Sequence, residues 1–140
     1  MAQQLQHYLC TAGLLPTLQS GFRPLYSTET AILRFLSAAV DRGDFAALVL
    51  LDLSAAFDTV DQDILLQRLQ TSFGIGGAAL KWFQSYLTSR TQYVRRGTAR
   101  STIVQLICGV PHSSVLGPLL FIMYTADLVS LIRMAADTAT

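Results

Sequence analysis

Asp52 is the residue whose place in the sequence most directly suggests chemistry. It follows residues 45–51, an apolar run without alternating polar side chains, which predicts a strand buried on both faces. A carboxylate at the end of such a strand is costly to remove from water unless it is paired or bound to a cation. Because sites are often built at strand ends, Asp52 is a candidate catalytic or metal-binding group. The alternative is a carboxylate that only caps the following turn.

Three more acidic residues, Asp58, Asp61 and Asp63, lie just before an apolar stretch that begins at Ile64. They invite a Ca²⁺ interpretation, but no Gly and terminal Glu follow at the spacing of a calcium loop. Acidic side chains favour the first turn of a helix because of the helix dipole. We therefore expect these residues to mark the N-terminus of a helix.

The elements that must position these side chains begin with an amphipathic helix. A cap at Ser27 or Thr28 precedes apolar residues at helical spacing, which predict one buried face. Those residues are Ile32, Phe35, Leu36, Ala39 and Val40. A second helix is expected from Ile64 to the glycines at 74–77, and a third over residues 78–87. Leu80, Phe83 and Leu87 form the apolar stripe of the third helix.

After residue 90, the pattern of the sequence changes to a period of two, as in β-strands. This pattern predicts a hairpin of residues 91–95 and 101–106 around a loop at 96–99. After a break at residues 109–111, Ser113 or Ser114 can cap one long apolar helix over residues 115–132. The order is helix, strand, two helices, hairpin, helix. This order predicts an α+β fold.

Composition bounds the class of protein. The chain has 140 residues, enough for one domain and hardly two. It is 51% hydrophobic and 14% charged, with a mean hydropathy of +0.42, against roughly 25% charged residues in ordinary soluble domains. Disorder is excluded by the ample apolar surface, and no apolar run approaches the ~20 residues needed to cross a bilayer. The excess of apolar residues indicates a surface covered by a partner or a piece of a larger fold.

Cysteine usage and the N-terminal sequence bear on the compartment. Cys10 and Cys108 lie far apart without metal-type spacing, so we expect two reduced, partly buried thiols. The N-terminus lacks a basic segment followed by a long apolar stretch, which argues against a signal peptide. We expect an intracellular protein that is not secreted.

Four motifs in chain order resemble the reverse transcriptase domain of LINE-type non-LTR retrotransposons, and together they cover about residues 19–130. QSGFR at 19–23, with Ser27 and Thr28, resembles the fingers motif, and LLDLSAAFDTVD at 50–61 resembles the first palm motif. WFQSYL at 82–87, with RTQ at 90–92, resembles the helix and hairpin between the palm motifs. GVP at 109–111, with SVLGPLLF at 114–121, resembles the second palm motif.

The resemblance implies an RNA-directed DNA polymerase, a nucleotidyltransferase that uses Mg²⁺, an RNA template and a DNA primer. Asp52 becomes a catalytic carboxylate that binds Mg²⁺ together with the backbone carbonyl of Leu53. By the resemblance, Phe57 is the steric gate that rejects a ribose 2′-OH. Without the resemblance, Phe57 would be interpreted as a core residue. The remaining implied contacts are to the nucleotide, through Arg23 and Ser114, and to template or primer, through Arg95, Arg96, Arg100 and His112. Without the resemblance, these arginines would be interpreted as solvated side chains of a loop or of the hairpin tip.

Two departures from the family pattern affect activity. The family has Gln-Gly-Ser after Gly-Val-Pro, whereas this chain has His112, Ser113 and Ser114. The family's Gly, which Ser113 replaces, allows the backbone to approach the nucleotide and template closely. The family's Tyr/Phe-Ala-Asp-Asp motif, which supplies the other metal carboxylates, is absent from these 140 residues. We expect a truncated reverse transcriptase that is inactive alone.

The expected architecture is a partial fingers–palm, with an incomplete antiparallel sheet packed on helices. It divides into a poorly patterned segment at 1–18, a partial reverse transcriptase domain at 19–132 and a divergent tail at 133–140. The alternatives are a repurposed RNA- or protein-binding module and an enzyme completed in trans by another chain. We expect the nucleus or cytoplasm, no membrane, and hydrophobic association through the exposed faces of the 45–51 strand and the 115–132 helix.

Overall fold

A computed structural model describes residues 1–16, 19–21, 23, 25–42, 55–111 and 114–138. Contacts between residues divide the chain into two units. The first comprises Met1–Leu15 and Ala55–Thr140, and the second comprises Pro16–Ser54. The predicted strand at 45–51, together with Asp52 and Leu53, lies outside the described residues.

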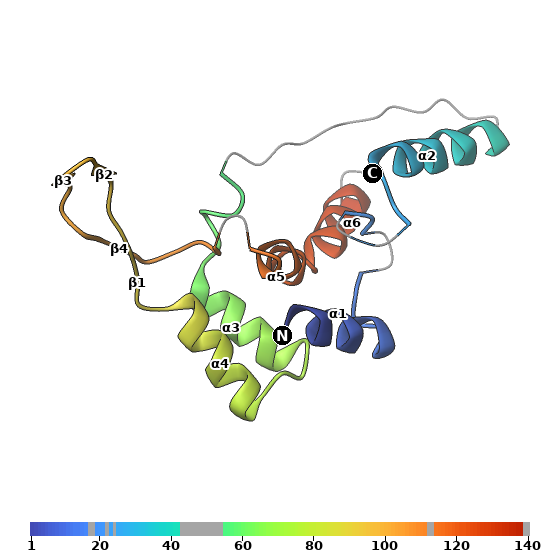
Figure 1. Cartoon of the computed structure of the whole chain (residues 1–140). Coiled ribbons are helices and arrows are strands. Elements are labelled where there is room, and N and C mark those ends of the chain that lie inside the picture. Colours follow the sequence, from blue (N-terminus) through green and yellow to red (C-terminus); the bar gives the residue numbers. More distant parts are fainter. Residues whose placement is uncertain (17–18, 22, 24, 43–54, 112–113, 139–140) are drawn as a thin grey trace. The chain divides into compact units, whose positions relative to one another are not determined.

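The first unit is built on five helices among its described residues: α1 (Ala2–Thr11), α3 (Gln62–Thr71), α4 (Gly77–Leu87), α5 (Leu116–Tyr124) and α6 (Leu128–Thr138). Helix α3 packs against both α4 and α5 (Figure 1). The core between the helices contains fully buried leucines from α1, α3, α4 and α5. They are Leu9, Leu65, Leu69, Leu87 and Leu120.

Helix α1 lies within residues 1–18, which we expected to be poorly patterned. Leu5 and Leu9 lie one turn apart and are both buried, because residues i and i+4 share one face of a helix. The hydroxyl of Tyr8 donates a hydrogen bond to the carbonyl of Phe73 (2.8 Å). The expectation of a poorly patterned N-terminal segment therefore missed a helix that packs into the core.

Helices α3 and α4 confirm the predicted second and third helices. The carboxylate of Asp61 accepts a hydrogen bond from the backbone N–H of Ile64 (2.9 Å), so it caps α3 as the acidic residues predicted. On α4, Phe83 and Leu87 are buried and Leu80 is partly buried against the core. The stripe predicted for this helix is confirmed.

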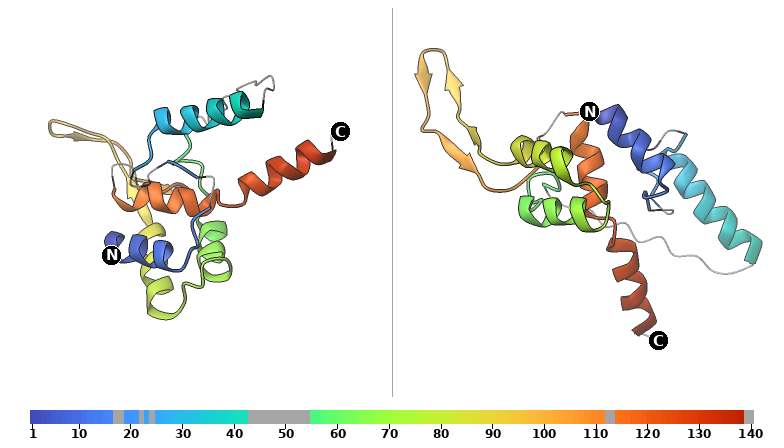
Figure 2. Two further views of the ribbon diagram at one scale, coloured as in Figure 1. Left: turned by 90° about the vertical axis from the view of Figure 1, so that its right-hand side faces the viewer. Right: turned by 90° about the horizontal axis from the view of Figure 1, so that it is seen from below.

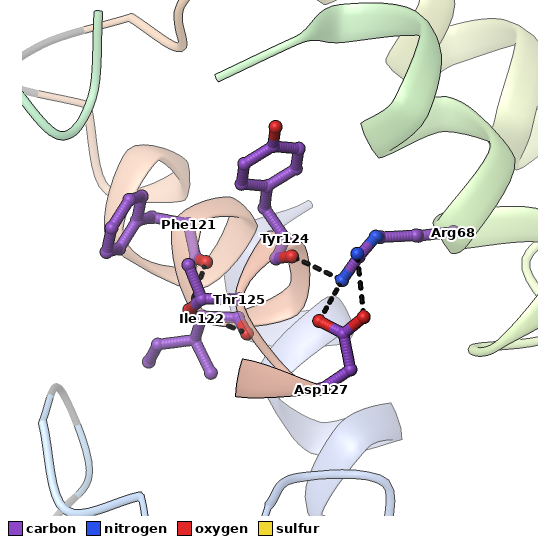
Figure 3. Close-up of polar contacts among 6 residues, drawn as sticks. All are labelled: Arg68, Phe121, Ile122, Tyr124, Thr125 and Asp127. Carbon is purple, nitrogen blue, oxygen red and sulfur yellow. Dashed lines mark hydrogen bonds and ion pairs between the residues drawn. The ribbon is translucent and has the colours of Figure 1, made fainter. Parts of the chain in front are cut away.

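The long helix predicted over residues 115–132 is wrong, because the chain breaks into α5 and α6. The break follows Tyr124, whose carbonyl accepts a hydrogen bond from Arg68 Nη1 (2.5 Å). The same guanidinium pairs with Asp127 through two bonds, of 2.5 and 2.8 Å (Figure 3). Thr125 Oγ1 also donates to the carbonyl of Phe121 (2.9 Å). The guanidinium of Arg68 thus occupies the carbonyl of Tyr124, which a continued helix would use for its own backbone bond. The carbonyl of Phe121 keeps its helical bond from the N–H of Thr125 (3.0 Å).

The pKa of Asp127 lies below its ordinary value, chiefly because its carboxylate accepts hydrogen bonds from Arg68 and further because of the attraction of that charge. A depressed carboxyl pKa keeps the group ionised through the neutral range, and the stability that it contributes is lost only as the pH falls through the lowered pKa. Asp127 is therefore ionised at neutral pH and keeps its pairing with Arg68 at the junction between α5 and α6.

The predicted hairpin is confirmed, with a tighter tip. Strands β1 (Arg90–Gln92) and β4 (Val104–Leu106) pair antiparallel, as do β2 (Arg95–Arg96) and β3 (Ala99–Arg100). These two separate two-stranded sheets follow one another along a single hairpin that leaves the end of α4 (Figures 1 and 2). Almost every residue of these strands is exposed. The α+β class is confirmed, but the strands that are described do not pack on helices as expected.

In the second unit, α2 (Thr28–Arg42) starts with a reciprocal cap. Ser27 Oγ accepts from the N–H of Thr30 (3.1 Å), and Thr30 Oγ1 accepts from the N–H of Ser27 (2.8 Å), as in a capping box. The helix is confirmed, but its predicted buried face is wrong: no residue of α2 is buried. Leu36 is 48% and Val40 78% exposed, because no described residue of this unit covers the stripe.

Other expected surfaces also differ from the structure. The apolar face of α5 is buried: Leu116, Leu119, Leu120 and Met123 lie in the core, so it does not provide the exposed face expected of the 115–132 helix. The last part of the 115–132 range lies on α6, and there the apolar side chains are exposed as expected. They are Leu128, Leu131 and Ile132, and Met134 follows them. The predicted boundary at residue 132 falls inside α6, and the boundaries stay predictions. No helix in the described ranges is long and apolar enough to cross a membrane.

Candidate functional site

The described part of the first palm motif begins at Ala55 and forms a tight turn. Ala55 adopts a left-handed conformation (φ +52°), which costs a residue with a side chain of order 1–3 kcal/mol. Its carbonyl accepts hydrogen bonds from the N–H groups of Asp58 (2.8 Å) and Thr59 (3.2 Å). Strained backbone of this kind persists only where its surroundings hold it in place. The turn therefore needs an external support.

The second palm motif supplies that support. The N–H of Gly109 donates to the carbonyl of Val60 (2.7 Å), and the N–H of Val110 donates to the carbonyl of Phe57 (2.8 Å). An isolated antiparallel bridge joins Asp61 to Cys108 next to them. Two motifs about fifty residues apart in the chain are therefore hydrogen-bonded into one structure.

Glycine is favoured at position 109 in this junction. Its φ is +83°, and a Cβ at this position would lie 3.1 Å from backbone atoms of Phe57 and Asp58. A side chain would therefore be strained by the positive φ and crowded by the close backbone approach. Gly117 at the start of α5 is comparably crowded, with 2.9 Å to the carbonyl oxygen of Pro111. The two glycines of the second palm motif thus allow close packing of backbone on backbone.

Phe57 lies half-buried in the supported turn. Its ring packs against the ring of Phe121 on α5, with 5.1 Å between centroids and a tilt of 52°. Such tilted aromatic pairs are favourable beyond the area that they bury. The backbone of Phe57 is thus fixed by Val110 and its ring by Phe121, so its side chain has a defined direction.

Ser114 uses its hydroxyl locally. Its Oγ donates to the carbonyl of Pro111 (2.8 Å) and accepts from the N–H of Gly117 (2.9 Å). The predicted capping role at the start of the α5 helix is confirmed. The nucleotide-binding role stays a prediction, because in this structure both bonds serve the chain itself.

Arg90 is a site residue to which the sequence analysis gave no role beyond its place in the RTQ motif at 90–92. It is half-buried, and its Nε donates to the carbonyl of Leu87 (2.9 Å). Its Nη2 donates to the carbonyls of Cys108 (3.3 Å) and Gly109. Gln62, a buried polar side chain, adds a bond from Nε2 to the carbonyl of Gly109 (3.3 Å). Sequence reasoning missed both roles, since backbone carbonyl acceptors leave no trace in residue types.

The other hairpin arginines are exposed, as a role in contacting template or primer requires. Arg95 pairs directly opposite Arg100 across β2 and β3, and like charges placed so are unfavourable without a counter-charge. The guanidinium of Arg100 lies over the ring of Tyr93 at 3.8 Å. Residues 64–126 contain six basic and no acidic residues, although the whole chain carries a net charge of only +1. The hairpin tip is therefore a local cationic surface.

Arg23 lies in the second unit, where its Nη1 donates to the carbonyls of Pro16 (3.2 Å) and Gln19 (3.1 Å). Its guanidinium also lies over the ring of Tyr26 at 5.3 Å. These contacts keep Arg23 folded onto its own loop. Its predicted role in binding a triphosphate stays a prediction.

The metal expected from the resemblance is tested only in part by the structure. No group of three or more potential His, Cys, Asp or Glu ligands occurs within the described ranges, and Asp61 is engaged as a helix cap. Mg²⁺ itself usually takes only one or two carboxylates from the protein. Asp52, Leu53 and His112 lie outside the described residues, and their roles stay predictions. Cys10 and Cys108 are free thiols as expected, but both are exposed rather than partly buried.

Comparison with known proteins identifies this arrangement. A family model described as "Reverse transcriptase (RNA-dependent DNA polymerase)" matches residues 1–139. The chain is 33% identical over 131 residues to the probable RNA-directed DNA polymerase from transposon BS of Drosophila melanogaster, covering 91% of this chain and 14% of that protein. It is 33% identical over 119 residues to the corresponding protein from transposon X-element of the same species, covering 83% and 13%.

A third relative is the RNA-directed DNA polymerase from mobile element jockey of Drosophila funebris. It is 30% identical over 117 residues, which cover 81% of this chain and 13% of that protein. The chain thus spans 13–14% of the length of the curated relatives that it matches.

Substitution of Gly109 tests the junction between the two motifs. We expect Gly109→Ala to lower the free energy of unfolding by about 1–2 kcal/mol for the left-handed conformation and by a further ~1–3 kcal/mol for crowding against the Phe57 turn. Gly97→Ala is the matched control, because Gly97 has a similar φ of +60° but nothing within 4 Å of its Cβ position. Denaturant unfolding measures the free energy of unfolding of both variants. Equal losses of stability in Gly109→Ala and Gly97→Ala would contradict a role of crowding at Gly109.

Proposed function

Because the chain belongs to the reverse transcriptase (RNA-dependent DNA polymerase) family, we propose that it forms part of the nucleotide site of an RNA-directed DNA polymerase. The observation that carries the proposal is the hydrogen-bonded junction at Gly109, which holds the turn bearing Phe57 against the second palm motif. A turn with a strained residue and a fixed aromatic ring is suited to discriminate between ligands by shape.

Phe57 is the proposed steric gate. Its ring is backed by Phe121 and its carbonyl is held by Val110, so the side chain cannot easily yield to a larger ligand. A rigid ring beneath a sugar rejects a ribose 2′-OH by overlap while accepting the deoxy sugar. Selection by exclusion of this kind depends on rigidity more than on new attractive contacts.

The other site residues are assigned by their match to the family motifs. Asp52 and the backbone carbonyl of Leu53 would hold Mg²⁺, whose preference is for oxygen ligands and which, when bound, stabilises charge on phosphate oxygens. Arg23 and Ser114 would contact the nucleotide, the first by exchanging its present carbonyl partners for phosphate oxygens. His112 would lie near template or primer.

By itself, the 140-residue chain is proposed to be inactive as a polymerase. Its sequence contains no Asp-Asp pair, and a single carboxylate does not hold two Mg²⁺ ions in place. His112 and Ser113 also replace the Gln-Gly of the family motif. Activity would need carboxylates from residues outside this sequence. We expect the chain to act in the nucleus or cytoplasm, where retroelement RNA and DNA meet.

Primer extension tests this function. With an RNA template, a DNA primer, dNTPs and Mg²⁺ or Mn²⁺, we expect the 140-residue chain to add no nucleotides above the level of its Asp52→Asn variant. Template-directed incorporation that is lost in Asp52→Asn would overturn the proposed inactivity, and it would at the same time establish Asp52 as catalytic.

A second candidate function, an RNA-binding module, is favoured by the cationic tip of the hairpin. Arg95, Arg96 and Arg100 lie together there, exposed and without an acidic residue anywhere in residues 64–126. Contacts of arginine with phosphate position a nucleic acid without reading its sequence. The hairpin could therefore hold RNA even where no nucleotide is incorporated.

A salt series separates this function from an inert polymerase fragment. For single-stranded RNA, the logarithm of the binding constant should fall with the logarithm of salt concentration by about 0.7 per phosphate contacted. Replacing Arg95, Arg96 and Arg100 together by Gln should therefore reduce the slope by ~2, as measured by filter binding.

The matched control removes the same charge from exposed positions elsewhere: Arg34→Gln and Arg42→Gln on α2 with Lys81→Gln on α4. We expect this triple variant to keep most of the slope. Equal slopes in the two triple variants, or no binding by the unmodified chain, would rule out the hairpin as an RNA-binding surface.

A further inference from the structure

One peptide group links a positive charge to the backbone of Phe57. The N–H of Val110 donates to the carbonyl of Phe57 (2.8 Å), and the oxygen of the same peptide, on Gly109, accepts from Arg90 Nη2 and from Gln62 Nε2. A charged donor on a carbonyl polarises the peptide and strengthens the bond that its N–H donates. The charge of Arg90 therefore acts on Phe57 although the two side chains belong to different motifs.

Arg90 is itself held by several acceptors. Its Nε donates to the carbonyl of Leu87 (2.9 Å), the last residue of α4, where the helix dipole places partial negative charge. Its Nη2 also reaches the carbonyl of Cys108 (3.3 Å). The fork of the guanidinium supplies donors in fixed directions, which a flexible ammonium does not. Arg90 thus joins the end of α4, the second palm motif and the Phe57 turn.

We propose that Arg90, assisted by Gln62, is a positioning residue that fixes the direction of Phe57 through the peptide between Gly109 and Val110. The inference rests on the proposed function in one respect, since Phe57 is taken as the sugar gate. It adds that the rigidity of the gate is set from the base of the hairpin, by a residue that does not touch the nucleotide.

Amide hydrogen exchange of the 140-residue chain, followed by NMR, tests the inference. We expect Arg90→Met to accelerate exchange at Val110 at least tenfold more than at Phe83, a buried residue within α4 that reports on general loss of stability. Gln62→Leu should produce the same local effect to a smaller degree. The exchange rate at Val110 in Arg90→Lys should lie between the rates in Arg90→Met and in the unmodified chain, because lysine keeps the charge but lacks the forked donors of the guanidinium.

Lys81→Met is the control, since it removes one exposed positive charge from α4 and should leave Val110 unchanged relative to Phe83. If Arg90→Met does not fold, Gln62→Leu carries the same comparison. Equal acceleration at Val110 and Phe83, or an unchanged Val110, would overturn the inference. Because exchange is read without nucleotide or primer, this result is independent of whether primer extension bears out the proposed function.

Discussion

The structure of the first unit depends on the peptide between Gly109 and Val110. Its N–H holds the carbonyl of Phe57, and its oxygen accepts from Gln62 and Arg90. Glycine is strongly favoured at position 109 by the positive φ and by the 3.1 Å approach of a Cβ to the Phe57 turn. Without this peptide, the Phe57 turn would lose the bond from Val110 to its carbonyl. The two palm motifs would then still be joined by the bond from the Gly109 N–H to Val60, the Asp61–Cys108 bridge and the ring contact of Phe57 with Phe121.

Much of the local structure could be predicted from the sequence because its signals are local. The cap at Asp61 and the stripe on α4 depend on residues within a few positions of one another, and the hairpin joins two neighbouring segments through one short turn. The family could also be predicted, since four motifs in order are specific. The expected α+β class follows from the same patterns, although the strand at 45–51 is not among the described residues.

Features set by distant partners could not be predicted. The break after α5 depends on Arg68, which lies 56 residues from Tyr124 in the chain. The role of Arg90 depends on carbonyl groups, which every residue carries and no composition reveals. Burial of α2 was also expected from its periodicity, which shows that a face is apolar but not what covers it. The roles of Asp52, Leu53 and His112 remain predictions of the family motif.

The nuclear Overhauser effect between the rings of Phe57 and Phe121 tests the union of the two palm motifs most directly. Their centroids lie 5.1 Å apart, although the residues belong to separate motifs and to different elements. We expect a clear cross-peak between their ring protons in the 140-residue chain in solution. Well-resolved signals from both rings without that cross-peak would contradict it, because the turn would then not be held against the second motif.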